Sequence, residues 1–91
     1  MGTAALKIRI MPESPESNLE SIKEKAKALA IKHNKVLVHS IEEEEIAFGL
    51  KAIILTLVWP EELDQSVIED ELAEIPEVNS VEVIDFRRVI G

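Results

Sequence analysis

Ninety-one residues, 46% hydrophobic and 31% charged, are enough for one hydrophobic core but too few for two, so we expect a single domain over residues 1–91. The absence of cysteine excludes disulfides, thiolate zinc sites and iron–sulfur clusters, and the formal charge of −8 opposes direct binding to nucleic acid. No stretch approaches the roughly 20 uncharged apolar residues that cross a bilayer, so we expect a cytoplasmic protein with no membrane partner.

The first predicted element is a strand over residues 5–11, in which apolar and charged residues alternate. The prolines that follow exclude its continuation. Ser17 and Glu20 are spaced as a capping box, which predicts a helix that runs to about His33 and is closed by Asn34. Apolar residues recur in it at spacings of three and four, so we expect one face to pack on a sheet: Leu19, Ile22, Ala26 and Leu29.

The middle of the chain predicts two further strands. Residues 36–41 form the second strand, and the four glutamates at 42–45 are interpreted as the turn after it. Those carboxylates are a conceivable cation site, but a solvated turn is the favoured interpretation and we predict no metal site. Residues 46–59 form a long β-rich run typical of a central strand, which Pro60 ends.

A second helix and a fourth strand complete the chain. Asp64 or Ser66 is the predicted helix cap, and Pro76 is its predicted end, with an apolar stripe of Val67, Ile68, Leu72 and Ile75. Residues 78–89 form the last strand. Simple alternation places Val81 and Val83 on one face of that strand. It places Ile84, Phe86 and Arg88 on the opposite face.

The order strand, helix, strand, strand, helix, strand, with no long linker, predicts an α+β fold of the ferredoxin-like split β-α-β type (βαββαβ). Such a domain has a four-stranded antiparallel sheet with two helices on one face. The order also makes the third and fourth strands parallel to each other. Residues at the start of the third strand and at the end of the fourth should therefore lie at opposite ends of the sheet.

Several functions found on this topology are disfavoured by the sequence. The loop at residues 11–17 has two prolines and two glutamates, so it lacks the free backbone amides with which an acylphosphatase-like enzyme cradles phosphate. Only 3% of the residues are aromatic, which disfavours an RNA-binding sheet, and a metal carrier would need paired cysteines. His33 and His39 lie in no recognisable catalytic motif. We therefore predict no catalytic residue and no cofactor, and expect a protein partner.

Two segments are more specific than the fold. Residues 46–51 read Ile-Ala-Phe-Gly-Leu-Lys, and residues 78–89 end in Phe-Arg-Arg-Val. They resemble the aromatic–glycine–aliphatic–lysine element and the C-terminal strand of the elongation factor 1-beta family. Residues 6–22, with Met-Pro-Glu at 11–13, also fit the first strand and helix of that family. The resemblance covers essentially the whole chain and, without the long N-terminal extension of eukaryotic members, indicates the minimal archaeal form.

The resemblance implies a guanine-nucleotide exchange factor that acts in translation on elongation factor 1-alpha. Such a factor binds this GTPase with GDP, accelerates GDP release, and lets GTP reload before aminoacyl-tRNA binds. It changes no covalent bond and acts by holding the empty GTPase more tightly than the GDP-bound one. We expect the free protein to be a monomer.

The resemblance also implies an exchange residue. Arg88 occupies the position of a basic residue that enters the magnesium and phosphate region of the GTPase. Eukaryotic members have lysine there, and because an arginine head is planar and wider, Arg87 remains an alternative carrier of that role.

A partner-binding set follows from the same resemblance: Phe48, Gly49, Lys51 and Phe86. Phe48 matches an aromatic that docks on a second domain of the GTPase. From the residues alone, Phe48 would be a core side chain at a strand start, Gly49 would mark a bulge or a close backbone approach, and Lys51 would pair with a carboxylate. Strands of eight to ten residues would place Phe48 and Arg88 about 25–30 Å apart.

Two other hypotheses remain. The first is a small ferredoxin-like regulatory domain that dimerises through strand edges and binds a metabolite. It ranks lower because no glycine-rich effector loop follows the first strand. The second is a scaffold that binds its partner without promoting nucleotide release.

Overall fold

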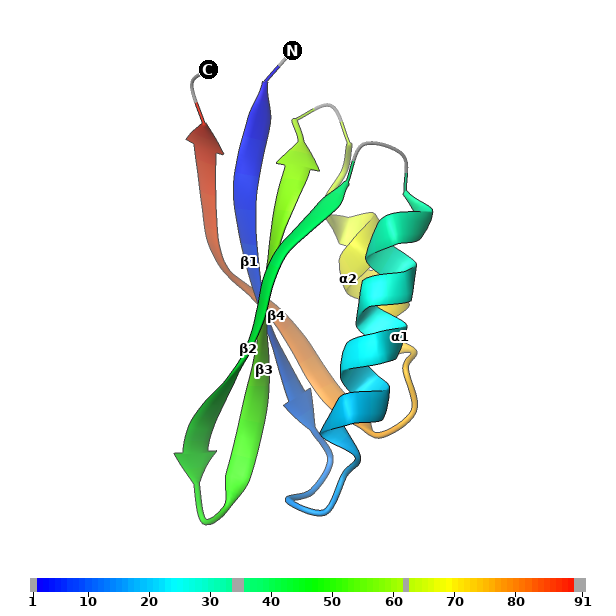
Figure 1. The fold of residues 1–91 in the computed structure, drawn as a ribbon, viewed down its shortest axis with the longest axis vertical. Helices are drawn as coiled ribbons and strands as arrows, with labels where there is room; N and C mark the ends of the chain where they lie inside the picture. Colours follow the sequence, from blue (N-terminus) through cyan, green and yellow to red (C-terminus); the bar gives the residue numbers. More distant parts are fainter. Residues whose placement is uncertain (1, 34–35, 62, 90–91) are drawn as a thin grey trace.

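The protein is described by a computed structural model that covers residues 2–33, 36–61 and 63–89. Its elements confirm the predicted order (Figure 1). They are β1 (Thr3–Pro12), α1 (Leu19–Lys32), β2 (Leu37–Ala47), β3 (Leu50–Pro60), α2 (Ser66–Ala73) and β4 (Val78–Val89). In the part of the chain covered by these ranges, no helix is both long and apolar enough to cross a membrane.

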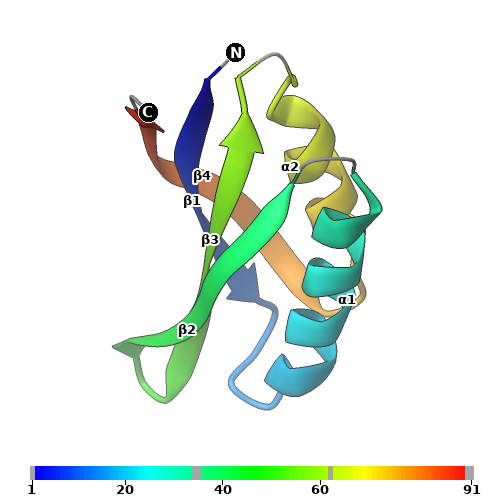
Figure 2. The same ribbon diagram turned by 45° about the horizontal axis from the view of Figure 1, so that its top comes forward.

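The four strands form one sheet in the order β2-β3-β1-β4, and every neighbouring pair is antiparallel. Both helices cover the same face of this sheet, and the other face is open (Figure 2). The β2–β3 hairpin projects beyond the helices at one end of the sheet (Figures 1 and 2). These features confirm the ferredoxin-like α+β fold and the parallel relation of β3 and β4.

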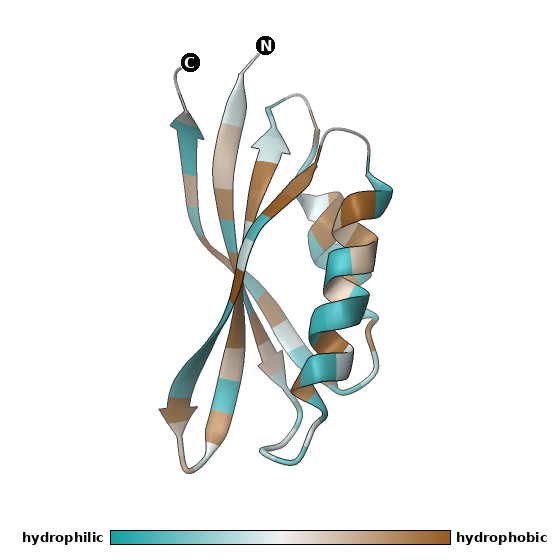
Figure 3. Cartoon of the chain, in the orientation of Figure 1, coloured by the Kyte–Doolittle hydropathy of each residue, from teal (hydrophilic) through white to brown (hydrophobic). Residues whose placement is uncertain are grey.

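The core lies between the sheet and the helices. On β1 every second side chain is fully buried, and the register places each one opposite a buried residue of β3. The helices add apolar residues at helical spacing, as Figure 3 shows in brown. Burying each of the larger aliphatic side chains contributes about 1.5–3 kcal/mol. The main contributors are Leu6, Ile8, Ile10, Ile22, Ala26, Leu55, Leu57, Trp59, Ile68 and Leu72.

The hairpin differs from its prediction. β2 continues to Ala47, so the four glutamates at residues 42–45 lie within a strand and form no turn. The turn instead consists of Phe48 and Gly49. β2 is an edge strand, where charged side chains remain solvated and discourage pairing with another chain. In Figure 3 this acidic run is the teal stretch of β2.

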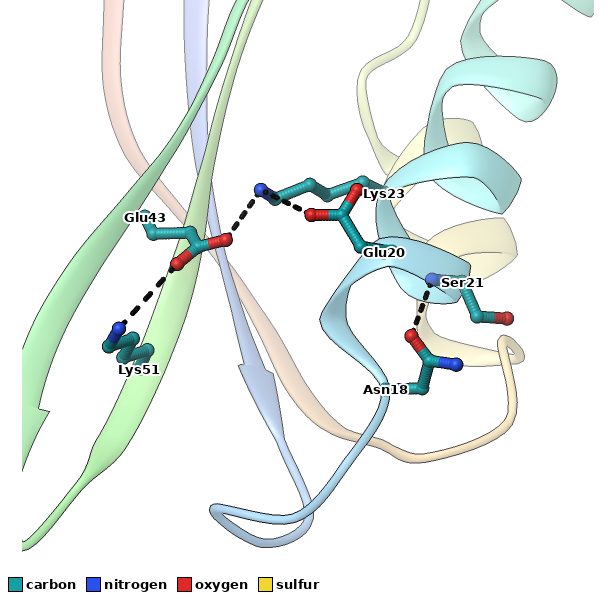
Figure 4. Close-up of polar contacts among 6 residues, drawn as sticks. All are labelled: Asn18, Glu20, Ser21, Lys23, Glu43 and Lys51. Atoms are coloured by element: carbon teal, nitrogen blue, oxygen red, sulfur yellow. Dashed lines mark hydrogen bonds and ion pairs between the residues drawn. The ribbon is translucent and has the colours of Figure 1, made fainter.

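The cap of α1 also differs from its prediction. Asn18 is the N-cap, and its side-chain oxygen accepts a hydrogen bond of 3.1 Å from the backbone N–H of Ser21 (Figure 4). Ser17 accepts one of 3.2 Å from the backbone N–H of Ser14 instead. The predicted box of Ser17 and Glu20 is therefore wrong by one residue, because serine and asparagine are equally able to cap.

The other helix ends follow the sequence in part. Asn34, the predicted end of α1, lies outside the described residues, and His33 occupies the C-cap position. Before α2, Asp64 accepts a hydrogen bond of 2.9 Å from the backbone N–H of Ser66. The N-cap position itself is Gln65, which makes no side-chain cap bond.

A bulge in β4 changes which face its last residues occupy. The register with β1 shifts so that Ile84 is an extra residue, and the alternation reverses after it. Phe86 therefore lies opposite Leu6, and Arg88 lies opposite Ala4. Both positions belong to the face that the helices cover, so the predicted placement of Phe86 and Arg88 on the face opposite the valines is wrong.

Candidate functional site

The tip of the β2–β3 hairpin presents one aromatic side chain. Phe48 and Gly49 connect the paired residues Ala47 and Leu50, and both turn residues have positive φ, of 52° and 80°. Such two-residue turns match the twist of a hairpin. Gly49 adopts its φ without strain and is neither a bulge nor a close approach, since a β-carbon there would meet nothing within 4 Å.

Phe48 is fully exposed, with a relative accessibility of 100%. The alternative prediction of a core role is therefore wrong. A left-handed conformation costs a bulky residue about 1–2 kcal/mol, and no burial of the ring offsets that cost. Phe48 thus contributes nothing to folding that a smaller polar residue would not, which separates it from the buried aromatic Trp59.

A chain of charged groups ties the hairpin to α1 (Figure 4). The Glu43 carboxylate lies 2.5 Å from Nζ of Lys23 and 3.9 Å from Nζ of Lys51, and Lys23 also lies 3.5 Å from the carboxylate of Glu20. The hydrogen bond from Lys23 lowers the pKa of Glu43, and the same contact raises the pKa of Lys23. The predicted pairing of Lys51 with a carboxylate is confirmed.

The opposite end of the sheet presents two arginines. Arg88 has a side chain 77% exposed, and its Nε lies 3.5 Å from the Oε1 atom of Glu61. Arg87 lies opposite Ala5 in the strand pairing, hence on the open face, and its Nε is 3.0 Å from the carboxylate of Asp85. The two arginines therefore project from different faces of the sheet and have different partners.

The two ends are well separated. Arg88 pairs with Ala4, and Ala4 pairs with Trp59. Trp59 is nine positions along β3 from Leu50, which follows the hairpin turn. At about 3.3 Å per residue, the hairpin turn and Arg88 are about 30 Å apart. The register thus confirms the predicted placement of Phe48 and Arg88 at opposite ends, and Figure 1 shows the β2–β3 turn and the end of β4 at opposite ends of the sheet.

Comparison with known proteins decides the family. Residues 5–89 match the family described as the EF-1 guanine nucleotide exchange domain. The chain belongs to this family. Over 90 residues it is 44% identical to elongation factor 1-beta of Methanosarcina acetivorans, covering 98% of this chain and 100% of that one. Over 87 residues it is 45% identical to elongation factor 1-beta of Methanocaldococcus jannaschii, covering 93% of this chain and 96% of that one. The resemblance inferred from sequence, including its archaeal character, is confirmed.

Solved structures that share the fold of this EF-1 exchange domain include an ACT domain. That structure is the crystal structure of the ACT domain from GTP pyrophosphokinase of Chlorobium tepidum, with a TM-score of 0.61 and 18% identity, covering 88% of this chain and 96% of that one. At this identity the likeness concerns the fold alone. It lends no support to the alternative of a metabolite-binding regulatory domain.

The exchange domain has no metal-binding cluster in its described ranges. Residues 2–33, 36–61 and 63–89 bring together no group of three histidine or acidic side chains that could hold a metal ion. A shallow hollow between α1 and α2 has mostly apolar walls, with Leu29 and Ile75 among its lining residues. The fully exposed aromatic side chain of Phe48 and the two exposed arginines instead lie at the two sheet ends.

Sequence reasoning missed one residue at the arginine end. Glu61, directly after β3, contacts Arg88 from 27 positions earlier in the chain. A signal was available, because the predicted fold brings the ends of the third and fourth strands to the same edge of the sheet. That signal predicts which strand ends lie close together, but it does not predict which side chain there contacts Arg88.

Proposed function

We propose that this chain is a guanine-nucleotide exchange factor for the GTPase elongation factor 1-alpha. It promotes the replacement of GDP by GTP and so regenerates the form that binds aminoacyl-tRNA. The single observation that carries the proposal is the match to the EF-1 guanine nucleotide exchange domain over residues 5–89.

The proposed mechanism is differential binding. The factor binds the nucleotide-free GTPase more tightly than the GDP-bound GTPase, and linkage then requires that bound factor weakens GDP to the same extent. Mg²⁺ and the charged groups around the phosphates hold the nucleotide in a GTPase, so disturbing that region is an efficient way to release GDP. No covalent step is needed.

At the hairpin end, Phe48 is the proposed anchor on a second domain of the GTPase. Its full exposure supports this role, because a buried aromatic in a partner pocket is typical of the residues that dominate binding energy. Gly49 permits the turn that presents the ring. Lys51 contacts Glu43, which is itself held by Lys23, so the base of the hairpin is braced against α1.

At the other end, Arg88 is the proposed exchange residue, because a guanidinium placed in the magnesium and phosphate region competes with the metal for the same anions. Its exposed side chain supports this role. Arg87 is the weaker candidate because it lies on the open face of the sheet, away from Phe86 and Arg88. Phe86, 40% exposed, shares the face of Arg88 and is proposed to pack beside it on the GTPase.

The separation of about 30 Å supports contact with two domains of the GTPase at once. Only a rigid connection lets an anchor at one end determine where a cation lies at the other. β3 supplies it, since it runs between the two ends through the buried centre of the sheet.

The proposal is tested by following the release of labelled GDP from elongation factor 1-alpha. Substoichiometric amounts of this protein should accelerate release, with each molecule acting on many GTPase molecules. An unrelated GTPase serves as the specificity control. If saturating protein leaves the release rate unchanged while still binding the GTPase, the exchange function is wrong and a scaffold role replaces it.

A further inference from the structure

The geometry points to Glu61 as a positioning residue that orients Arg88. The missing side chain of Gly2 leaves the space that the Glu61 carboxylate occupies. The inference rests on the proposed function of Arg88 and extends it to residues that neither the sequence comparison nor the resemblance assigns. Three segments distant in sequence meet here: the start of β1, the end of β3 and the end of β4.

The backbone fixes the position of Glu61. Its N–H donates a hydrogen bond of 3.2 Å to the carbonyl oxygen of Gly2. Next to this bond, Thr3 of β1 pairs with Pro60 of β3 and with Val89 of β4. Glu61 thus starts from the edge of a paired region rather than from a free loop.

The side chain of Glu61 lies across Gly2. A β-carbon built on Gly2 would overlap Oε2 of Glu61, closer than such atoms approach in proteins, and would lie 3.0 Å from its Cδ. Only a glycine leaves room for the carboxylate in this place. The Glu61 side chain is 30% exposed against 77% for Arg88, so the acid is the more fixed member of the pair.

The contact engages one edge of the guanidinium. Glu61 approaches Nε of Arg88, at 3.5 Å. An arginine head has five N–H donors, four of them on the two terminal nitrogens. Across residues 2–33, 36–61 and 63–89, no ion pair involves those terminal nitrogens. Within these ranges Glu61 therefore engages the inner edge of the head and leaves its terminal nitrogens to bind an anion of the partner.

The bulge at Ile84 is part of the same arrangement. Because of the extra residue, Arg88 lies on the face of Ala4 and Trp59, adjacent to the strand end from which Glu61 emerges. Without the bulge, Arg88 would lie on the open face, where Arg87 lies now. A surface ion pair adds little stability, so the consequence of this contact is orientation. Ordering a long side chain in advance lowers the conformational cost of reaching the bound state.

Two variants test the inference, with GDP release from elongation factor 1-alpha measured over a range of factor concentrations. Glu61→Gln removes the charge and keeps the shape. Gly2→Ala keeps the charge but displaces the carboxylate, and it leaves the fold intact because only the end of a flexible side chain must move. Both should lower the maximal release rate by about two- to tenfold, with the half-saturating concentration little changed. Glu24→Gln, at an exposed position on α1, is the matched control and should match the wild type.

Combination with Arg88→Ala separates positioning from general effects. In the Arg88→Ala background, Glu61→Gln should cause no further loss, since there is no side chain left to orient. If both single variants match the wild type, or if Glu61→Gln slows release equally with and without Arg88, the positioning role is wrong. A faster Glu61→Gln variant would also overturn it, because Glu61 would then restrain Arg88. Failure of the wild-type protein to release GDP would instead refute the proposed function itself.

Discussion

The two ends of the sheet reach similar exposure by different means. Phe48 projects from a turn built by neighbouring residues, and its conformation depends on Gly49 and on the hairpin alone. Arg88 lies where three distant segments meet, and its surroundings depend on the strand order and on a bulge. The hairpin end is formed by residues adjacent in sequence and tolerates changes elsewhere in the fold. The arginine end is formed by residues distant in sequence and is sensitive to the register of the sheet. Substitutions at each end should therefore differ in kind as well as in size.

The largest effect is expected from Phe48→Ala. Loss of an aromatic anchor costs about 2 kcal/mol or more, which raises the half-saturating concentration for GDP release roughly thirtyfold. Folding stability should not fall, because the ring packs on nothing in the free protein. Val67→Ala, at an exposed apolar position on α2, is the control. An equal effect of both substitutions would refute a specific anchor.

A smaller effect, of a different kind, is expected from Arg88→Ala. Removing the cation should lower the maximal release rate about tenfold, which corresponds to about 1.4 kcal/mol of barrier. The half-saturating concentration should change little. Arg87→Ala should lower the rate less, because Arg87 projects from the open face, away from Phe86 and Arg88. A stronger effect of Arg87→Ala would transfer the exchange role to Arg87.

Phe48→Asn tests the conformational cost at the hairpin end. Asparagine adopts a left-handed conformation more easily than phenylalanine, and Asn-Gly is the preferred pair in such turns. The free energy of unfolding should rise by about 1 kcal/mol in denaturant titrations, while binding to the GTPase falls as in Phe48→Ala. A less stable Phe48→Asn variant would show that the turn carries no such strain.

The smallest effect is expected away from both ends, where Glu71 of α2 lies 2.7 Å from Nζ of Lys32 and 2.5 Å from Nε2 of His33. The hydrogen bond from Lys32, then that from His33, lowers the pKa of Glu71 below its ordinary 4.5. A carboxyl with a lowered folded-state pKa stabilises the fold above its unfolded value and loses that contribution as pH falls through the folded value.

The unfolding free energy should therefore decrease below about pH 4.5, and Glu71→Gln should flatten this part of the profile. The change is modest because the pair is near the surface. GDP release at neutral pH should be unaffected. If the unfolding free energies of Glu71→Gln and the wild type change with pH in the same way between about pH 3 and 5, this contact does not contribute to the acid dependence of stability.

Periodicity was sufficient to predict most of the fold. The alternation in β1 and the helical spacing in α1 follow directly from burial on one face, and β4 occupies the predicted residues 78–89. The hairpin was harder, because a glutamate run disfavours strands by propensity while an edge position tolerates it. Lys23 on α1, which stabilises Glu43 in that run, is distant in sequence, and no local pattern reveals the contact.

The sequence was sufficient to predict the candidate site residues and the end of the sheet at which each lies, but not the face of the sheet from which each projects. Topology alone placed Phe48 and Arg88 at opposite ends of the sheet. The bulge at Ile84 then moved Arg88 to the other face, and a bulge leaves little trace in an alternating sequence. Glu61 and Gly2 come together only through the completed register, which explains why sequence patterns did not select them.

The separation of the two ends is tested most directly by GDP release at limiting concentration for Phe48→Ala, Arg88→Ala and the double variant. Sites about 30 Å apart that contact different domains of the GTPase should act independently. The loss in the double variant should then equal the product of the single losses, roughly three-hundredfold if the singles lose about thirtyfold and tenfold. A double variant no slower than the slower single variant would contradict the account, because it would mean that both residues serve one and the same contact.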